Sequence, residues 1–348
     1  LSRHCRGIAR FLPVLIVCCQ GYSICHGADT RNLEPGELAG RIFAETGFQG
    51  GLIVHVGCGD GRLTAALRGG EGYLVHGLDT DAENVKKART HIAARGVRGN
   101  VTVEQWDGRY LPYVDNLVGL LVGEDPGGLA ADEIMRVLSP GGVAYLKKDG
   151  TWTKIVKPWP DDIDEWTHFQ HGPDNNSVAQ DRVVGPPRHM QWLAGPTWTR
   201  HHHADKGTDP AIRAVVSAQG RLYYTVDETE SSNMQVPSEW FLAARDAFSG
   251  VLLWKVPMHV TGYERRLEQL WRGLIADGDS VYAQLGTGEP LSALDGPTGR
   301  VTRSYPGTED LREVIKYEGT LLVITEENTL VALHAATGRL LWQWNPGE

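Results

Sequence analysis

The first half of the chain alternates short apolar runs with longer amphipathic stretches. A β-branched run such as residues 52–56 predicts a buried strand, and the stretch at residues 82–95 predicts a helix. Strands separated by helices pair in parallel through right-handed crossovers. Residues 36–150 therefore predict an α/β Rossmann-like domain with a parallel sheet. Its expected strands lie at residues 52–56, 73–78, 101–103, 117–122 and 143–146, and its expected helices at residues 62–68, 82–95 and 130–138.

The pattern changes after this domain. Residues 151–203 are rich in Trp, Pro, Asp and His, show little periodicity, and are interpreted as a linker and the opening strand of a second domain. Residues 204–348 are β-rich and contain three aligned segments, A-R-D-A-F-S-G, A-L-D-G-P-T-G and A-L-H-A-A-T-G, which end at Gly250, Gly299 and Gly338. Each segment lies between strand-like runs, so the repeat predicts a four-stranded antiparallel unit that occurs three times.

The final Ser-Gly or Thr-Gly pair of each segment predicts a hairpin turn in which glycine adopts a positive φ. Trp254 and Trp342 follow that glycine by four residues, and Tyr305 holds a comparable place two residues later. We expect these aromatic side chains to pack between neighbouring units. A closed β-propeller needs about four to eight units, so three predict an incomplete propeller with an open edge. The chain is therefore expected to be a fragment of a longer protein, and completion by a partner chain is the alternative.

Residues 1–28 have the pattern of a signal peptide. Arg3, Arg6 and Arg10 precede the apolar residues 11–19, which are too few to span a bilayer as a helix. We therefore expect an exported protein, periplasmic or secreted, with no membrane span. Of the five cysteines only Cys58 lies outside this leader, so neither an internal disulfide nor a thiolate metal cluster is expected after export. The formal net charge of −9 argues against nucleic acid as a partner.

The most specific chemical signal is a glycine-rich turn, V-H-V-G-C-G-D-G-R-L, at residues 54–63. A glycine turn between a strand and a helix lets the backbone approach a ligand closely. Asp79 ends the second predicted strand, where a carboxylate can accept hydrogen bonds from ribose hydroxyls. Trp106 and Asp107 follow the third strand, where they could hold an adenine ring and its amino group. The candidate cofactor-binding residues are His55, Gly57, Cys58, Gly59, Asp60, Gly61, Asp79, Trp106 and Asp107.

Together with the helix-to-strand segment E-I-M-R-V-L-S-P-G-G at residues 133–142, this pattern resembles the class I S-adenosylmethionine-dependent methyltransferases. By that resemblance, Gly57, Gly59 and Gly61 would wrap the methionine end of S-adenosylmethionine. Asp79 would bind the ribose and Asp107 the adenine. The resemblance names no catalytic residue in this chain. An unrelated nucleotide-binding Rossmann domain is the alternative.

The chain departs from that family at two positions. The family usually has an acidic residue where this chain has His55, and an Asp where this chain has Asn116. A histidine repels a nearby ammonium group when it is protonated. We therefore expect weak cofactor binding that weakens further as the pH falls through the range where His55 becomes charged. Glu124 and Asp125 end the fourth strand, either as catalytic or substrate-binding groups or as solvated loop carboxylates.

Residues 161–348 resemble the quinoprotein-like propellers, a group that includes pyrroloquinoline-quinone dehydrogenases and propeller assembly lipoproteins. The resemblance rests on the three repeats and on W-T-H-F…D-N-N-S-V…V-G-P-P-R-H-M-Q-W at residues 166–192. It implies the architecture; scaffolding propellers share these repeats, and a bound quinone is not expected here. His168, His171 and the run at residues 201–203 are interpreted as hydrogen-bonded residues of the opening strand. A metal site is the alternative, and none is predicted.

Three functions compete. The first is a methyltransferase whose α/β domain binds S-adenosylmethionine and whose propeller face recruits an unidentified substrate or protein partner. The second is a non-catalytic exported scaffold, and the third is a quinone-dependent oxidoreductase. The intact glycine turn and Asp79 favour ligand binding by the α/β domain, as the first function requires.

Overall fold

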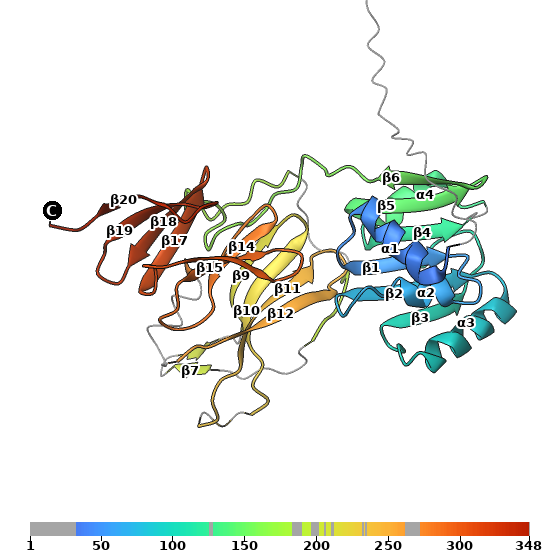
Figure 1. Ribbon diagram of the computed structural model, residues 1–348, viewed down its shortest axis with the longest axis horizontal. Helices are drawn as coiled ribbons and strands as arrows, with labels where there is room; N and C mark the ends of the chain where they lie inside the picture. The colour runs from blue at the N-terminus through green and yellow to red at the C-terminus, as the bar shows by residue number, and fades with distance from the viewer. Residues whose placement is uncertain are drawn as a thin grey trace, which may run out of the picture.

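The computed structural model describes most of the chain after residue 32. The described residues are 33–124, 128–182, 190–195, 202–204, 207–209, 212–231, 233, 235–261 and 272–347. The predicted signal peptide at residues 1–28 and the carboxylate of Asp125 lie outside them. Figure 1 shows an α/β domain joined to a β-rich region that extends away from it. No helix among the described residues is long and apolar enough to cross a membrane.

One six-stranded sheet forms the α/β domain. Its strand order is β3-β2-β1-β4-β5-β6, and neighbouring strands are parallel except for the antiparallel pair β5–β6. The predicted Rossmann-like parallel sheet is thereby confirmed. Its strands are β1 (Gly51–Val56), β2 (Tyr73–Asp79), β3 (Val101–Gln105), β4 (Val118–Glu124), β5 (Leu138–Lys148) and β6 (Thr151–Val156). The helices are α1 (Pro35–Thr46), α2 (Arg62–Ala66), α3 (Ala82–Ala94) and α4 (Ala131–Val137).

Both faces of this sheet are covered. Successive strand residues point to opposite faces, so Ile53 joins a core with α1, α2 and α3, and Val54 joins a second core with α4. His55 shares the face of Ile53 and is directed toward α2. Parallel sheets with both faces buried are rich in apolar residues throughout, and all six residues of β1 are buried.

The predicted end of the α/β domain at residue 150 comes too early, because the sheet continues for one more strand. Residues 151–156, interpreted as the start of the linker, form β6 at the edge of the sheet. Trp152 explains the difference, because its ring stacks on Tyr145 of β5 with centroids 4.8 Å apart and planes 10° apart. The tight turn at Asp149 and Gly150, both with positive φ, brings the two strands together. An aromatic pair across an antiparallel edge stabilises such pairing.

The described residues of the β-rich region form three four-stranded antiparallel sheets, each with its strands adjacent in sequence order. They are β9 (Ile212–Ala218), β10 (Arg221–Asp227), β11 (Trp240–Asp246) and β12 (Leu252–Met258); β13 (Ile275–Asp277), β14 (Ser280–Gln284), β15 (Leu291–Asp295) and β16 (Val301–Tyr305); and β17 (Leu311–Tyr317), β18 (Thr320–Thr325), β19 (Leu330–His334) and β20 (Leu340–Trp344). The threefold repeat of a four-stranded unit is therefore present. The first unit begins at Ile212 rather than residue 204, since β7 (His202–Ala204) and β8 (Gly207–Asp209) form a separate pair.

The repeat glycines adopt the predicted turn conformation. Gly250, Gly299 and Gly338 have φ values of 71°, 71° and 74°. Trp254 packs on Gly299 of the second sheet, and Tyr305 packs near Gly338 of the third. The predicted packing between neighbouring units is thus confirmed at these two contacts.

A short segment connects the first strands of all three sheets. Ser217 N–H in β9 donates to Trp166 O (2.7 Å), and Ala276 N–H in β13 donates to Thr167 O (2.9 Å). Lys316 N–H in β17 donates to His168 Nε2 (3.1 Å). Each donor is the second-last residue of the first strand of its sheet, so the three donors are equivalent. Three consecutive residues can reach three equivalent N–H groups only if the first strands converge.

The two regions meet at the amino ends of the parallel strands. Leu253 of β12 lies against Gly50, which precedes β1, and Gly72, which precedes β2. Gln191 Nε2 donates to Phe248 O (3.1 Å) in the β-rich region and to Asn116 O (3.3 Å) before β4. The glycine turn follows the other end of β1. The described interface and the candidate cofactor site therefore lie at opposite edges of the sheet (Figure 1).

Candidate functional site

The glycine turn that follows β1 forms an open loop. Gly57, Gly59 and Gly61 all have positive φ, at 72°, 55° and 80°. The N–H groups of Gly57 and Cys58 both donate to Leu78 O, at 2.8 and 3.1 Å, which fixes the loop to the end of β2. No heavy atom lies within 4 Å of a Cβ built at Gly59. Hydrogen bonds therefore fix the start of the loop, and the space beside Gly59 is free. A loop whose backbone contacts a ligand needs both properties.

Gly61 is needed for close packing against α3 and does not border open space. A Cβ at this position would lie 2.7 Å from Ala88 Cα and Cβ in α3. Its absence lets α2 and α3 pack closely beneath the loop. The predicted role of Gly61 in wrapping a cofactor is therefore indirect in this structure.

Asp79 lies at the centre of the candidate site. Its Oδ2 accepts from Gly59 N–H (2.8 Å), and its Oδ1 accepts from Asp81 N–H (2.9 Å) and Asn84 Nδ2 (3.3 Å). The residue is 6% exposed. A carboxylate offers about four acceptor positions, so Asp79 can hold the loop and still accept a hydroxyl hydrogen bond. The sequence predicted the residue but not its bond to Gly59, which depends on the parallel pairing of β1 with β2.

Trp106 and Asp107 lie beside Asp79 at the same edge. Trp106 N–H donates to Asp79 O (2.9 Å), and its indole Nε1 donates to Tyr110 O (2.6 Å). Asp107 is exposed, and its Oδ1 accepts from Arg109 N–H (2.9 Å). The half-buried indole and the exposed carboxylate supply a ring face and an acceptor next to the ribose candidate. This arrangement suits an adenine with an exocyclic amino group.

The other two loop side chains have local roles. Asp60 is exposed and forms an ion pair with Arg62 at the start of α2 (3.2 Å). Cys58 is buried, and burial raises the pKa of its thiol to about 12. A thiol with that pKa stays protonated and is a poor nucleophile. Cys58 contributes its backbone and its packing to the loop.

His55 points away from the open side of the loop, into the core. It is 3% exposed, and its Nδ1 shares a 2.8 Å hydrogen bond with Thr64 Oγ1 of α2. Burial lowers the pKa of His55 to about 4, so the ring stays neutral near pH 6. The expected weakening of cofactor binding through protonation of His55 is therefore not supported. Thr64 was missed from the sequence, because only the docking of α2 on β1 brings the two side chains together.

Glu124 and Lys147 form a second feature of this edge. Lys147 Nζ lies 2.9 Å from Glu124 Oε2, and the Glu124 side chain is 42% exposed. The backbone oxygen of Glu124 lies 3.6 Å from a Cβ built at Gly57, so β4 ends directly beside the glycine loop. Glu124 is one of the two carboxylates proposed from the sequence, and Lys147 was not proposed.

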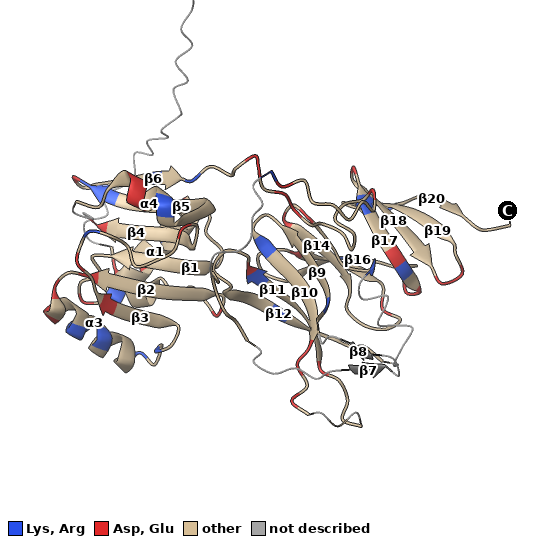
Figure 2. Ribbon diagram, turned by 180° about the vertical axis from the view of Figure 1, so that it is seen from behind, with Lys and Arg blue, Asp and Glu red and all other residues tan. Residues whose placement is uncertain are grey.

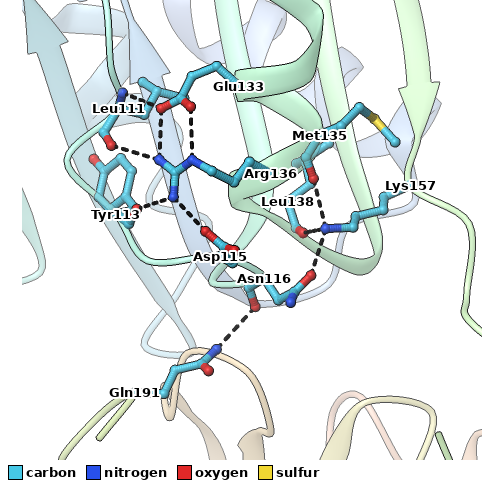
Figure 3. Close-up of polar contacts among 10 residues, drawn as sticks. All are labelled: Leu111, Tyr113, Asp115, Asn116, Glu133, Met135, Arg136, Leu138, Lys157 and Gln191. Atoms are coloured by element: carbon cyan, nitrogen blue, oxygen red, sulfur yellow. Dashed lines mark hydrogen bonds and ion pairs between the residues drawn. The ribbon is translucent and has the colours of Figure 1, made fainter. Parts of the chain in front are cut away.

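Asn116 belongs to a structural network at the opposite edge. The Arg136 guanidinium donates to both oxygens of Glu133, at 2.7 and 2.8 Å, and to Asp115 Oδ1 at 2.8 Å (Figure 3). Lys157 Nζ donates to Asn116 Oδ1 (2.6 Å) and to two carbonyl oxygens at the end of α4. The network joins α4 to the segment before β4. Replacement of the family's Asp by Asn116 thus affects a junction rather than the candidate cofactor site.

His168 and His171 each have their own hydrogen-bond partner. His171 Nε2 lies 2.6 Å from Asp164 Oδ2, while His168 accepts from Lys316 N–H. Where the structure describes the chain, no three His, Cys, Asp or Glu side chains gather as a metal-binding group. Of the run at residues 201–203, His201 lies outside the described residues, and the other two begin β7.

Comparison with known proteins assigns the α/β domain. Residues 53–142 match a family model described as "Methyltransferase domain". A demethylmenaquinone methyltransferase of Desulfitobacterium hafniense is 31% identical over 102 residues, covering 27% of this chain and 40% of that protein. The methyltransferase GfsG of Streptomyces halstedii is 25% identical over 126 residues, covering 33% of this chain and 45% of that protein. The chain therefore spans less than half the length of these curated relatives.

Among solved structures, a putative S-adenosylmethionine-dependent methyltransferase of Methanococcus maripaludis is 26% identical over 32% of this chain and 54% of that one, with a TM-score of 0.30. The family match shows that residues 53–142 are similar to a methyltransferase domain. S-adenosylmethionine is accordingly its candidate cofactor. The open loop at Gly59, the carboxylate of Asp79 and the exposed Asp107 fit the hydroxyl and amino groups of that molecule.

Proposed function

We propose, on the premise that residues 53–142 are a methyltransferase domain, that this chain binds S-adenosylmethionine at the carboxyl edge of its parallel sheet and transfers the methyl group to an acceptor. The observation that carries the proposal is the position of Asp79. Its carboxylate is buried, holds the open glycine loop through Gly59, and lies next to Trp106. All of these features lie at the carboxyl edge of the parallel sheet.

The chain's own residues would act by binding and orientation. Asp79 would accept a hydrogen bond from a ribose hydroxyl, Asp107 would accept from the adenine amino group, and Trp106 would border the ring. When bound, the cofactor supplies an activated methyl group. The loop backbone at Gly57 and Gly59 would place it beside the end of β4. Such positioning accounts for much of the rate in group transfer between two bound molecules.

Glu124 is the residue we propose for the acceptor side. Its Oε2 is paired with Lys147, whose charge keeps the side chain oriented toward the edge. Its Oε1 would accept a proton or a hydrogen bond from the group that receives the methyl. A carboxylate positioned in this way contributes by general base catalysis or by orientation.

For the β-rich region we propose the architecture of a propeller segment. The first strands β9, β13 and β17 lie side by side in that order, and residues 166–168 bond to all three. Convergence of first strands on one axis is what radial repetition of sheets produces. The described part of this region contacts the α/β domain at the edge opposite Asp79. This position favours a region that binds a partner and does not cover the cofactor site.

Export through the predicted leader stays part of the proposal. An exported methyltransferase domain needs its cofactor to be supplied where it works. A non-catalytic platform that retains the fold is the competing function, and the absence of an acidic side chain at position 55 favours it.

The deciding experiment is a calorimetric titration of the chain with S-adenosylmethionine. We expect binding by the wild type, and a loss on the order of 1.5–3 kcal/mol in Asp79→Ala, which is roughly 10- to 150-fold in affinity. Asp295→Ala is the control, because this carboxylate of the β-rich region bonds to Thr298 within its own turn. Equal affinity in the wild type and Asp79→Ala would remove the assignment, and no binding by a folded wild type would favour the platform.

A further inference from the structure

A cavity of about 260 Å³ lies where the α/β domain meets the β-rich region, and both regions contribute to its walls. Figure 1 and Figure 2 show, from opposite sides, that β1 and β2 face β11 and β12 across this junction. Junctions between domains are frequent ligand sites, and cavities of about 300–1,000 Å³ hold drug-sized molecules. The cavity is therefore a candidate site for a smaller ligand.

Aromatic rings from three separate segments border this cavity. Phe48, which follows α1, lies 3.4 Å from a Cβ built at Gly51. Trp159 and Phe248 lie 3.5 and 3.0 Å from a Cβ built at Gly220. Their two rings meet edge to face, with centroids 6.0 Å apart and planes 72° apart. The rings and the glycine backbone beneath them form apolar walls that suit the hydrocarbon part of a ligand.

Asp246, at the end of β11, directs a carboxylate oxygen toward the same space. Its Oδ1 accepts from the N–H of Ser249 (2.6 Å) and from its hydroxyl (2.5 Å). Its Oδ2 lies 3.5 Å from a Cβ built at Gly51 and thus faces the α/β domain. Because both bonds from Ser249 go to Oδ1, Oδ2 can accept a hydrogen bond from a ligand.

The charges at the cavity favour a cation. Among the residues that the structure describes, the charged side chains that line it are Arg221, Asp246 and Asp279. Arg221 donates to Asp279 Oδ1 (2.8 Å), so the ionised Asp246 leaves a net charge of −1. Burial raises the pKa of Asp246, although the bonds from Ser249 and the charge of Arg221 oppose that rise. A cation beside this carboxylate would stabilise its charged form, and aromatic faces also attract cations.

We propose that this cavity binds a small organic cation, an amine that carries an apolar ring or chain. Its N–H group would donate to Asp246 Oδ2, and its apolar part would lie among Phe48, Trp159 and Phe248. An anion is disfavoured, because Arg221 is already paired. The ligand would contact both regions at once, so its binding would hold them together. The inference goes beyond methyl transfer, since the cavity and the candidate cofactor site lie at opposite edges of the sheet.

The test uses the full chain and phenethylamine, a primary ammonium group attached to a phenyl ring through a short chain. Two analogues change only the polar group: 2-phenylethanol is neutral, and phenylacetate is an anion. Asp246→Asn removes the charge but keeps an oxygen that can accept from Ser249. Asp295→Asn is the matched control, because Asp295 holds the equivalent turn position of the second sheet, bonds to Thr298, and lies outside the cavity.

We expect ligand-observed NMR titrations to show binding of phenethylamine by wild type and by Asp295→Asn. Binding by Asp246→Asn should be at least about tenfold weaker, the effect of one lost charge-assisted hydrogen bond. Both analogues should bind the wild type more weakly than the amine does.

Equal affinity of wild type and Asp246→Asn would overturn the proposal. So would an equal loss in both aspartate variants, an analogue that binds as tightly as the amine, or no binding of the amine by a folded wild type. If Asp246→Asn loses its melting transition, Trp159→Leu replaces it, because this change removes one ring of the cavity and keeps the carboxylate. Weaker binding is expected there, and unchanged affinity would count against the site.

Discussion

The α/β domain and the β-rich region use the same backbone device for opposite purposes. The glycine loop has Gly57, Gly59 and Gly61 at positive φ, two residues apart, and each sheet of the β-rich region has one such glycine in its repeat turn, at Gly250, Gly299 and Gly338. At Gly59 the space above the turn is open, whereas at Gly250 and Gly299 it is filled by the indoles of Trp192 and Trp254. A glycine motif therefore predicts a backbone conformation but not what fills the space beside it. Only the neighbouring unit decides whether the freed space receives a ligand or a side chain.

The aspartates of the two regions differ in the same way. Asp79 reaches across from β2 to a loop that follows β1, so it joins segments that the parallel sheet brings together. Asp295 bonds only within its own turn, to the N–H of Thr298 at 3.1 Å. The D-x-x-[S/T]-G pattern is thus a local turn with its own cap. A carboxylate that spans two strands is the better indicator of a binding edge.

The largest loss of stability is expected from substitution of Gly61, the one of the three loop glycines that packs closely against α3. Gly61→Ala would place a Cβ 2.7 Å from the backbone of α3 at Ala88, at a φ of 80°. We expect a loss of about 3 kcal/mol or more in the free energy of unfolding. The matched change Gly59→Ala meets no atom within 4 Å and should cost about 1 kcal/mol, from backbone strain alone.

Chemical denaturation of both variants measures the difference. Similar costs for the two would show that Gly61 is not a packing residue. The same two variants also separate a glycine beside open space, Gly59, from a glycine packed against a neighbouring helix, Gly61. Gly59→Ala should impair S-adenosylmethionine binding more than it impairs folding.

The next effect compares two equivalent tryptophans. Trp254→Ala removes a hydrogen bond to Gly296 O and a ring that covers Gly299, and we expect a loss of about 3 kcal/mol. Trp342 holds the same repeat position but is 46% exposed, so Trp342→Ala should change stability by about 0.5 kcal/mol or less. Thermal melting of both variants tests this. A large loss in Trp342→Ala would contradict the exposed position of this side chain.

The smallest effect, counted per pH unit and per residue, is a pH dependence that both regions share. Burial lowers the pKa of His55 and of His168 to about 4, below the ordinary value of about 6.5. Between these values the unfolded chain binds protons that the folded chain does not. Stability is therefore complete above about pH 6.5 and is lost as the pH falls toward 4, by at most about 1.4 kcal/mol per pH unit for each histidine.

Denaturation midpoints measured from pH 7 to pH 4.5 test that slope. His55→Gln and His168→Gln should each reduce it, and the double variant should reduce it by the sum, because the sites are in different regions. An unchanged slope in both single variants would contradict the burial effect. Cofactor affinity should not change between pH 6 and pH 8 through His55, since its ring is neutral throughout that range.

Local patterns determined much of this protein from its sequence. The apolar runs and helical stretches predicted the strand and helix order of the α/β domain, and the threefold A-x-[D/H]-x-x-[S/T]-G segment predicted the number of four-stranded sheets. The glycine turn, Asp79 and Trp106 were identifiable because a ligand-binding edge requires those residue types after consecutive strands. All of these signals depend on neighbours within a few residues along the chain.

Contacts between distant segments were decided only by the tertiary structure. β6 joins the sheet because Trp152 stacks on Tyr145, and His55 is neutral because the folded α/β domain buries its ring. The attachment of the β-rich region to the amino ends of the strands depends on Leu253 meeting two glycines about 180 and 200 residues away in sequence. No local pattern encodes such pairs, because their free energy comes from surfaces that exist only once both partners are folded.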